Sequence, residues 1–109
     1  MATDVLLVLT TVPDATTARD IADALVGNSL AACVTALPPA TSTYRWQGAV
    51  EHAEEIPLLI KTTRQRLGAL TEALRSGHPY EVPEILALPV EAGLPAYLDW
   101  VAAATSDGR

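Results

Sequence analysis

The order of hydrophobic and polar residues along this chain predicts a strand followed by an amphipathic helix. Residues 4–11 form an almost continuous apolar run, which is typical of a strand in the centre of a sheet. Apolar residues then recur at helical spacing from Ala18 to Val26. Asp14 is placed to cap the first turn of this helix. We expect Gly27 and Asn28 to end it, because both residues tolerate left-handed φ angles.

The next segment predicts a long hairpin. A strand over residues 30–37 is followed by a second strand, on which Tyr44 and Trp46 share one face. Gln47-Gly48 has turn chemistry and joins this strand to a partner over residues 50–62. The tip is too polar to belong to a core and contains Glu51, His52, Glu54 and Glu55. Because an exposed strand edge invites pairing, we expect the hairpin to contact another protomer.

Pro57 conflicts with a regular strand at this point in the sequence. It interrupts a run whose neighbours Ile56, Leu58 and Ile60 are all apolar. Proline lacks the N–H group that a central strand needs for its ladder. We therefore expect either a β-bulge or a local loss of pairing around Pro57.

The second half of the chain repeats the helix–strand order and adds one helix. We predict a helix over residues 64–76 ended by Gly77, a strand over residues 84–88, and a third helix from Leu94-Pro95. The third helix has an apolar face made of Tyr97, Trp100, Val101 and Ala104, and its last residues, 105–109, are expected to fray. This order predicts an α+β fold, a ferredoxin-like βαββαβ sandwich with an extended β-hairpin and an extra C-terminal helix. Its first two helices should cover one face of an antiparallel sheet.

Composition narrows the class of protein. A chain of 109 residues, half of them apolar, predicts a single domain over residues 1–109. The formal net charge of −6 argues against nucleic acid or an anionic membrane as a partner. Cys33 is the single cysteine, so an internal disulfide is excluded. The first residues lack a signal-peptide pattern and a membrane-spanning run, and we expect a cytoplasmic protein.

Four side chains are candidate metal ligands, namely Cys33, His52, His78 and Glu84, but their spacing matches no metal-binding motif. Cys33 lies among small residues and favours a buried apolar role. His52, on a polar hairpin, is expected to be solvated. His78 follows a helix and suits either contact with the last helical carbonyl groups or ligand binding. No spacing defines a nucleophile and its base, so we assign no catalytic residue and expect no enzymatic activity.

Lys61 and the stretch from residue 78 to residue 89 suit either structure or binding. Three prolines keep this stretch extended, and such a backbone is suited to gripping a small ligand or filling an interface. Lys61 ends an apolar strand, where a lone ammonium group needs a partner. An ion pair with Glu81 or Glu84 is the favoured interpretation, and contact with an anionic ligand is the alternative.

Five sequence blocks occur in an order that resembles the CutA family of divalent-cation tolerance proteins. The blocks are LAACV (30–34), YRWQG (44–48), EEIPLLIKT (54–62), HPYEVPEIL (78–86) and YLDWV (97–101). The resemblance extends from Leu7 to Val101, which is nearly the whole chain. It implies a ferredoxin-like protomer in a tight homotrimer, with the hairpin and the third helix pairing across subunits. It also implies a role in tolerance to copper and other divalent cations.

The resemblance further implies that Cu²⁺ or another divalent cation binds at Cys33 and His78, with Glu84 as a neighbour. Some family members carry Cys where this chain has Thr10, and a second His where it has Gly77. Both departures remove good ligands for late transition metals. We therefore expect weak metal binding at protomer boundaries.

A second functional class is a signalling trimer that resembles PII-like regulators. Such a protein would bind a small anionic ligand in clefts between subunits. In this sequence the clefts would lie near Trp46, Lys61 and Tyr80, because concave subunit boundaries with one charge and several rings suit such a ligand.

Overall fold

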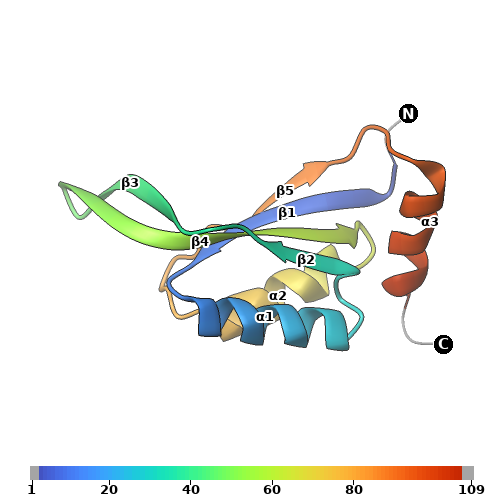
Figure 1. The fold of residues 1–109 in the computed structure, drawn as a ribbon, viewed down its shortest axis with the longest axis horizontal. Coiled ribbons are helices and arrows are strands. Elements are labelled where there is room, and N and C mark those ends of the chain that lie inside the picture. Colours follow the sequence, from blue (N-terminus) through green and yellow to red (C-terminus); the bar gives the residue numbers. More distant parts are fainter. Residues whose placement is uncertain (1–2, 107–109) are drawn as a thin grey trace.

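A computed structural model describes residues 3–106 and confirms the predicted order of helices and strands. The elements are β1 (Val5–Val12), α1 (Ala15–Gly27), β2 (Cys33–Ala36), β3 (Ala40–Trp46), β4 (Ala49–Thr63), α2 (Leu67–Gly77), β5 (Leu86–Pro89) and α3 (Pro95–Ala104). The strands pair antiparallel, and α1 and α2 lie together on one face of the sheet (Figure 1). Among residues 3–106, no helix has the length and hydropathy that crossing a bilayer requires.

β4 is the strand with which three other strands pair. Its second half lies between β2 and β1, and β5 pairs with the other side of β1. Its first half pairs with β3, so that β3 and β4 form a hairpin that projects away from the helices (Figure 1). The described chain is accordingly elongated, with principal extents of 45 × 27 × 23 Å.

The main core lies between the sheet and the pair α1 and α2. Side chains of β1 alternate, so that Val8 and Val12 are fully buried while Leu7 and Leu9 on the other face are partly exposed. The helices add apolar residues at the predicted spacing. The buried members of this core are Val8, Val12, Ala18, Ile21, Leu25, Ala31, Leu58, Ile60, Leu70 and Leu74. A smaller buried cluster holds α3 against the sheet and consists of Val5, Ala32 and Val101.

The ends of α1 confirm the sequence analysis in part. Asp14 caps the helix, and its Oδ1 accepts a hydrogen bond from the backbone N–H of Thr17 at 2.7 Å. The predicted left-handed end at Gly27 and Asn28 is wrong. Asn28 has a φ of −99°, and the left-handed residue is Ser29, with a φ of 58°. The turn is completed one residue later than expected.

The hairpin turn forms where the sequence predicts it. Gln47 and Gly48 have φ angles of 50° and 83°, which is what a two-residue turn of type I′ requires. Trp46 pairs with Ala49 and Tyr44 with Glu51 in the register that follows. Tyr44 and Trp46 therefore share one face of the hairpin, as predicted.

An irregular pairing at Pro57 confirms the expected bulge. The pairing of β4 with β2 stops at Leu58, and its pairing with β3 starts at Glu55. Between these two pairings, Ile56 and Pro57 of β4 lie opposite three residues, 37–39, of the segment that joins β2 to β3. The carbonyl of Pro57 accepts a hydrogen bond from the N–H of Leu37 at 2.9 Å, so the proline nitrogen also faces this bulge. The missing N–H therefore removes no hydrogen bond to β1, whose register continues unbroken.

Three predicted boundaries are too early in the sequence. β2 begins at Cys33, α2 at Leu67 and β5 at Leu86, each two or three residues after the expected start. The residues before β2 belong instead to the turn that ends α1. The N–H of Leu30 bonds the carbonyl of Leu25 at 2.9 Å, which withdraws it from the sheet.

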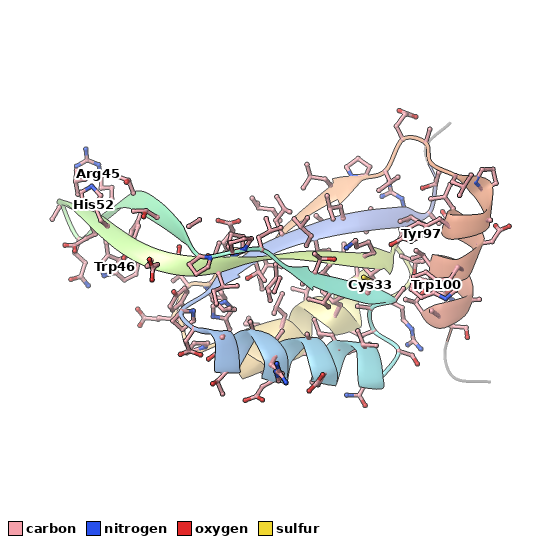
Figure 2. All side chains as sticks on the ribbon, in the orientation of Figure 1. Cys33, Arg45, Trp46, His52, Tyr97 and Trp100 are labelled. Atoms are coloured by element: carbon pink, nitrogen blue, oxygen red, sulfur yellow. The ribbon has the colours of Figure 1, made fainter. Side chains whose placement is uncertain are left out.

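The predicted apolar face of α3 is divided in the structure. Val101 is fully buried, whereas Tyr97 and Trp100 are 41% and 47% exposed and have ring centroids 5.6 Å apart (Figure 2). The expected fraying is wrong for Thr105, which is 2% exposed and donates from its hydroxyl to the carbonyl of Val101 at 2.8 Å. Residues 107–109 lie outside the described part.

Two glycine substitutions should change stability in opposite directions. Gly48→Ala places a side chain in a left-handed conformation and should lower the free energy of unfolding by about 1 kcal/mol. Gly68→Ala, in a helix and with open space around the new Cβ, should raise it by about 0.5 kcal/mol. Urea denaturation at one fixed protein concentration measures both changes. Equal shifts of the same sign would contradict this account of the turn.

Candidate functional site

The proline-rich stretch after α2, residues 78–89, is held to the base of the hairpin by a hydrogen bond. The hydroxyl of Tyr80 donates to Oε2 of Glu55 at 2.6 Å. Glu55 is only 8% exposed, so the prediction that it belongs to an exposed polar tip is wrong. Glu55 lies where the hairpin meets the body of the fold, and the proline-rich stretch after α2 covers it. Two segments 25 residues apart in the sequence thus meet at one place.

His78 begins this stretch and is held by both nitrogens of its ring. Nδ1 accepts the backbone N–H of Tyr80 at 3.2 Å, so the proton of a neutral ring is on Nε2. Nε2 donates to the carbonyl of Thr11 at 2.9 Å and lies 3.4 Å from the hydroxyl of Thr10. The side chain is 8% exposed. His78 therefore positions the stretch against β1, and neither ring nitrogen is free for another ligand.

The carboxylate of Glu55 is held in its charged form. Burial raises the pKa of Glu55, but the hydroxyl groups of Ser42, Tyr80 and Thr11 outweigh it, and the pKa lies below its ordinary value. Burial and then the hydrogen bond to Glu55 raise the pKa of Tyr80. At neutral pH the pair consequently consists of a carboxylate and a neutral phenol that donates to it.

A cavity of about 680 Å³ lies between this stretch and one face of the hairpin. Trp46 and Tyr80, two of the three residues predicted for a ligand cleft, line it together with Tyr44 and Glu55. Lys61, the third, does not line it. Glu81 and Glu84 also line this cavity and add two carboxylates to it. The structure therefore unites the predicted rings with acidic groups in place of the predicted lysine.

Lys61 lies on the sheet face that α1 and α2 leave uncovered. Its Nζ donates to the hydroxyl of Thr35 at 2.6 Å and lies 3.7 Å from Sγ of Cys33. The predicted ion pair with Glu81 or Glu84 is wrong, since the one ion pair of residues 3–106 joins two side chains of α2. The reason is register, because pairing of β4 with β2 sets Lys61 directly beside Cys33.

The three predicted metal ligands do not meet within one chain. Cys33 shares the uncovered sheet face with Lys61, whereas His78 contacts Thr10 and Thr11 through its ring. Glu84 is exposed at the cavity. In the part of the chain that the structure describes, no group of three or more His, Cys, Asp or Glu side chains could hold a metal ion. A copper site made of these three side chains does not fit the geometry of a single protomer.

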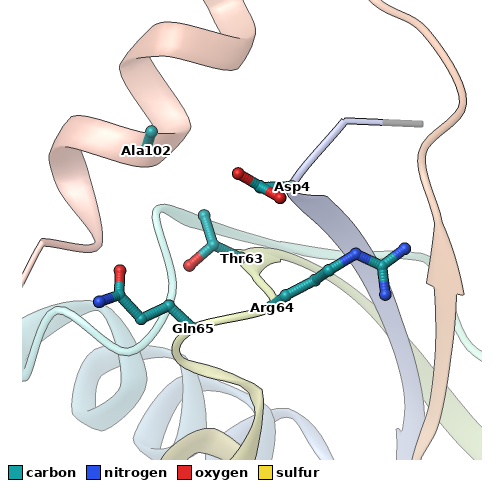
Figure 3. A pocket seen from close by; sticks show the side chains of 5 residues that line it. All are labelled: Asp4, Thr63, Arg64, Gln65 and Ala102. Atoms are coloured by element: carbon teal, nitrogen blue, oxygen red, sulfur yellow. The ribbon is translucent and has the colours of Figure 1, made fainter. Parts of the chain in front are cut away.

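A second, smaller pocket of about 390 Å³ lies near the start of β1 and beside α3. It is lined by Asp4, Thr63, Arg64, Gln65 and Ala102 (Figure 3). The backbone N–H of Arg64 donates to the carbonyl of Asp4 at 2.9 Å, which ties the chain after β4 to the start of β1. None of the residues predicted for a site lies here.

The uncovered sheet face carries a continuous apolar layer. Leu9 pairs with Leu59 on one side and with Leu86 on the other, and Leu7 pairs with Leu88. Neighbouring pairs across strands present their side chains on the same face. Leu86 and Leu88 are 55% and 43% exposed, and no element of the described chain covers them (Figure 1).

Comparison with known proteins places these features in one family. The sequence profile of the family described as "CutA1 divalent ion tolerance protein" matches residues 6–104. A "Protein CutA homolog" of Xenopus laevis is 52% identical over 91 residues, which are 84% of this chain and 60% of that protein. A "Divalent-cation tolerance protein CutA" of Thermus thermophilus is 52% identical over 95 residues, which are 87% of this chain and 92% of that protein.

Solved structures agree with the sequence comparison. The crystal structure of CutA from Xylella fastidiosa has a TM-score of 0.94 and 47% sequence identity to this chain. The structural match covers 95% of this chain and 100% of the Xylella fastidiosa chain. The arrangement of helices and strands described above is therefore shared with that protein over nearly its full length.

Removal of the Tyr80 hydroxyl should destabilise the fold in a pH-dependent way. Tyr80→Phe leaves the buried Glu55 carboxylate with one donor fewer, and we expect a loss of about 1–2 kcal/mol in the free energy of unfolding at pH 7. The folded-state pKa of Glu55 is lowered, so its stabilising contribution is present above the ordinary value of 4.5 and is lost as pH falls through the folded pKa. The difference between Tyr80→Phe and wild type should therefore narrow in acid.

Tyr97→Phe is the matched control for this measurement, because it keeps the exposed ring on α3 and removes a hydroxyl that makes no hydrogen bond within residues 3–106. Its free energy of unfolding should follow that of the wild-type protein at every pH. A Tyr80→Phe deficit that stays constant from pH 7 to pH 3 would contradict the role assigned to the Glu55 carboxylate.

Proposed function

This chain belongs to the family of CutA1 divalent ion tolerance proteins, and from that membership we propose that it supports cellular tolerance of divalent cations as a non-enzymatic homotrimer. The observation that carries the assembly is the uncovered apolar layer on the sheet. A small protein that leaves a contiguous apolar face in water gains stability when another copy covers it. Three copies would also give the exposed edges of the hairpin strands a partner.

The proposed protomer is ferredoxin-like, and the proposed interface combines three of its surfaces. The apolar layer supplies the buried centre, and the projecting hairpin supplies unpaired strand edges. The rings of Tyr97 and Trp100 on α3 are exposed in the isolated chain and suit the same interface. This division of roles supports the prediction that the hairpin and α3 pair across subunits.

Metal binding enters this proposal at the protomer boundary. Cys33 lies on the uncovered sheet face and would therefore lie near a neighbouring protomer, beside Lys61. His78 has both ring nitrogens in use and contributes its side chain to the fold. We expect Cu²⁺ binding to be weak and independent of His78. The PII-like alternative and the cytoplasmic location stay predictions, and the absence of Lys61 from the cavity gives the former no support within one chain.

Substitution of one exposed leucine should disrupt the assembly. Wild-type protein should elute with a mass near three times the 11.5 kDa of the chain when size-exclusion chromatography is coupled to light scattering. Leu88→Glu puts a charge into the apolar layer and should shift the mass toward that of one chain. Val26→Glu is the control, because Val26 is 43% exposed, as Leu88 is, and lies on α1, outside the proposed interface. A wild-type protein that runs as a stable, folded single chain would refute the trimer.

Tolerance itself is measured in cells. A bacterial strain that lacks its own family member should regain growth at inhibitory copper concentrations when it expresses this chain. The Leu88→Glu variant should fail to restore growth while Val26→Glu succeeds, because the proposed function requires the assembly. Soluble wild-type protein that leaves the copper sensitivity unchanged would refute the tolerance role.

Calorimetric titration with Cu²⁺ tests the assignment of His78. We expect His78→Gln to give the same binding isotherm as the wild-type protein at neutral pH, because both nitrogens of His78 already serve hydrogen bonds within the fold. Circular dichroism of the variant checks that it is folded before the titration. A loss of Cu²⁺ affinity in folded His78→Gln would restore this residue to the metal site.

A further inference from the structure

The cavity beside the hairpin combines aromatic faces with carboxylates. The rings of Tyr44, Trp46 and Tyr80 line it from two segments of the chain, the hairpin and the stretch after α2. Glu55 lies among them, nearly buried at the base of the hairpin. No lysine, arginine or histidine lines the cavity within residues 3–106. The chemistry of this cavity is therefore that of a site for positive charge.

Basic side chains of the hairpin are directed elsewhere. Arg45 lies between Tyr44 and Trp46 in β3, so its side chain is on the opposite face of the hairpin. His52 pairs with Thr43 on that opposite face, and both basic residues lie toward the tip (Figure 2). The carboxylate of Glu55 consequently accepts from the hydroxyl of Tyr80 and takes part in no ion pair of the described residues.

We propose that this cavity binds a small organic cation, a protonated or quaternary amine, between the aromatic faces of Tyr44, Trp46 and Tyr80 and the carboxylate of Glu55. Cations are attracted to the faces of tryptophan and tyrosine rings, and the attraction is strongest where water is excluded. A nearly buried carboxylate adds a charge-assisted contact of fixed position. The volume of about 680 Å³ is in the range of cavities that hold small ligands.

An inorganic cation fits this cavity less well than an amine does. Mg²⁺ and Ca²⁺ need several oxygen ligands at one point. The carboxylates here do not form such a group, because no three acidic side chains of residues 3–106 converge. Glu81 and Glu84 are exposed and contribute negative potential at the cavity. An anionic ligand would meet these charges with no basic group to offset them.

Two probes of equal shape separate charge from apolar contact. Butylammonium carries the charge, and 1-butanol is its neutral counterpart. Titration of each into the assembled protein, followed by the indole N–H resonance of Trp46 in ¹⁵N-edited NMR spectra, measures both affinities at one site. We expect saturable shifts with butylammonium and an affinity for 1-butanol that is lower by about tenfold or more.

Two substitutions test the residues, each with a matched control. Glu55→Gln removes the charge and keeps an oxygen that can accept from Tyr80, and it should reduce butylammonium affinity by about tenfold. Glu54→Gln removes an equal charge from an exposed position on the opposite face of the hairpin, where Glu54 pairs with Thr41, and it should leave the affinity unchanged. Trp46→Leu should weaken binding by about fivefold, and the Tyr80 resonances then report the titration. Val26→Ala removes apolar surface from an exposed position on α1, away from the cavity, and should leave the affinity unchanged.

Three results would overturn the proposal. Equal affinities for butylammonium and 1-butanol would show an apolar pocket without charge selection. An equal effect of Glu55→Gln and Glu54→Gln would show general attraction to an acidic protein. A Trp46 resonance that responds to neither probe would show that another copy of the chain fills the cavity in the assembly. None of these outcomes bears on copper tolerance, which the growth assay tests separately.

Discussion

The double pairing of β4 is the constraint on which the rest of this structure depends. One strand of 15 residues pairs with β1 and β2 along one half and with β3 along the other. The change of partner occurs at Pro57, whose missing N–H would break a regular ladder but here faces a bulge. Because β4 continues through this point on its β1 side, the hairpin projects as a direct continuation of the sheet.

The projection creates the cavity, and polar contacts set its second wall. His78 fixes the start of the proline-rich stretch to β1 through both ring nitrogens. Tyr80 then reaches across to Glu55 at the base of the hairpin. Each of these groups has low exposure or a buried partner, so loss of one contact leaves another polar group without its hydrogen bond. His78 and Tyr80, which the sequence analysis named for metal binding and for a ligand cleft, therefore serve to hold two segments together.

The sheet separates two kinds of surface. On its uncovered face, Lys61 and Cys33 stand at the border of a leucine layer that invites another copy of the chain. At the hairpin, the rings stand beside carboxylates and no base. The ligand set implied by the family resemblance, Cys33, His78 and Glu84, mixes these locations. The mixture arose because a resemblance carries each ligand position over separately and does not show which of these side chains meet within one chain.

The sequence by itself determined the order of elements, the cap at Asp14, the turn at Gln47-Gly48 and the irregularity at Pro57. These features depend on backbone preferences and on periods of a few residues, which any local segment displays. Only the tertiary structure decided that Glu55 is buried, that Lys61 contacts Thr35 in place of a carboxylate, and that the rings of Trp46 and Tyr80 share a cavity with acids. Contacts of this kind join segments some 25 or more residues apart, and strand register fixes them after the chain has closed on itself.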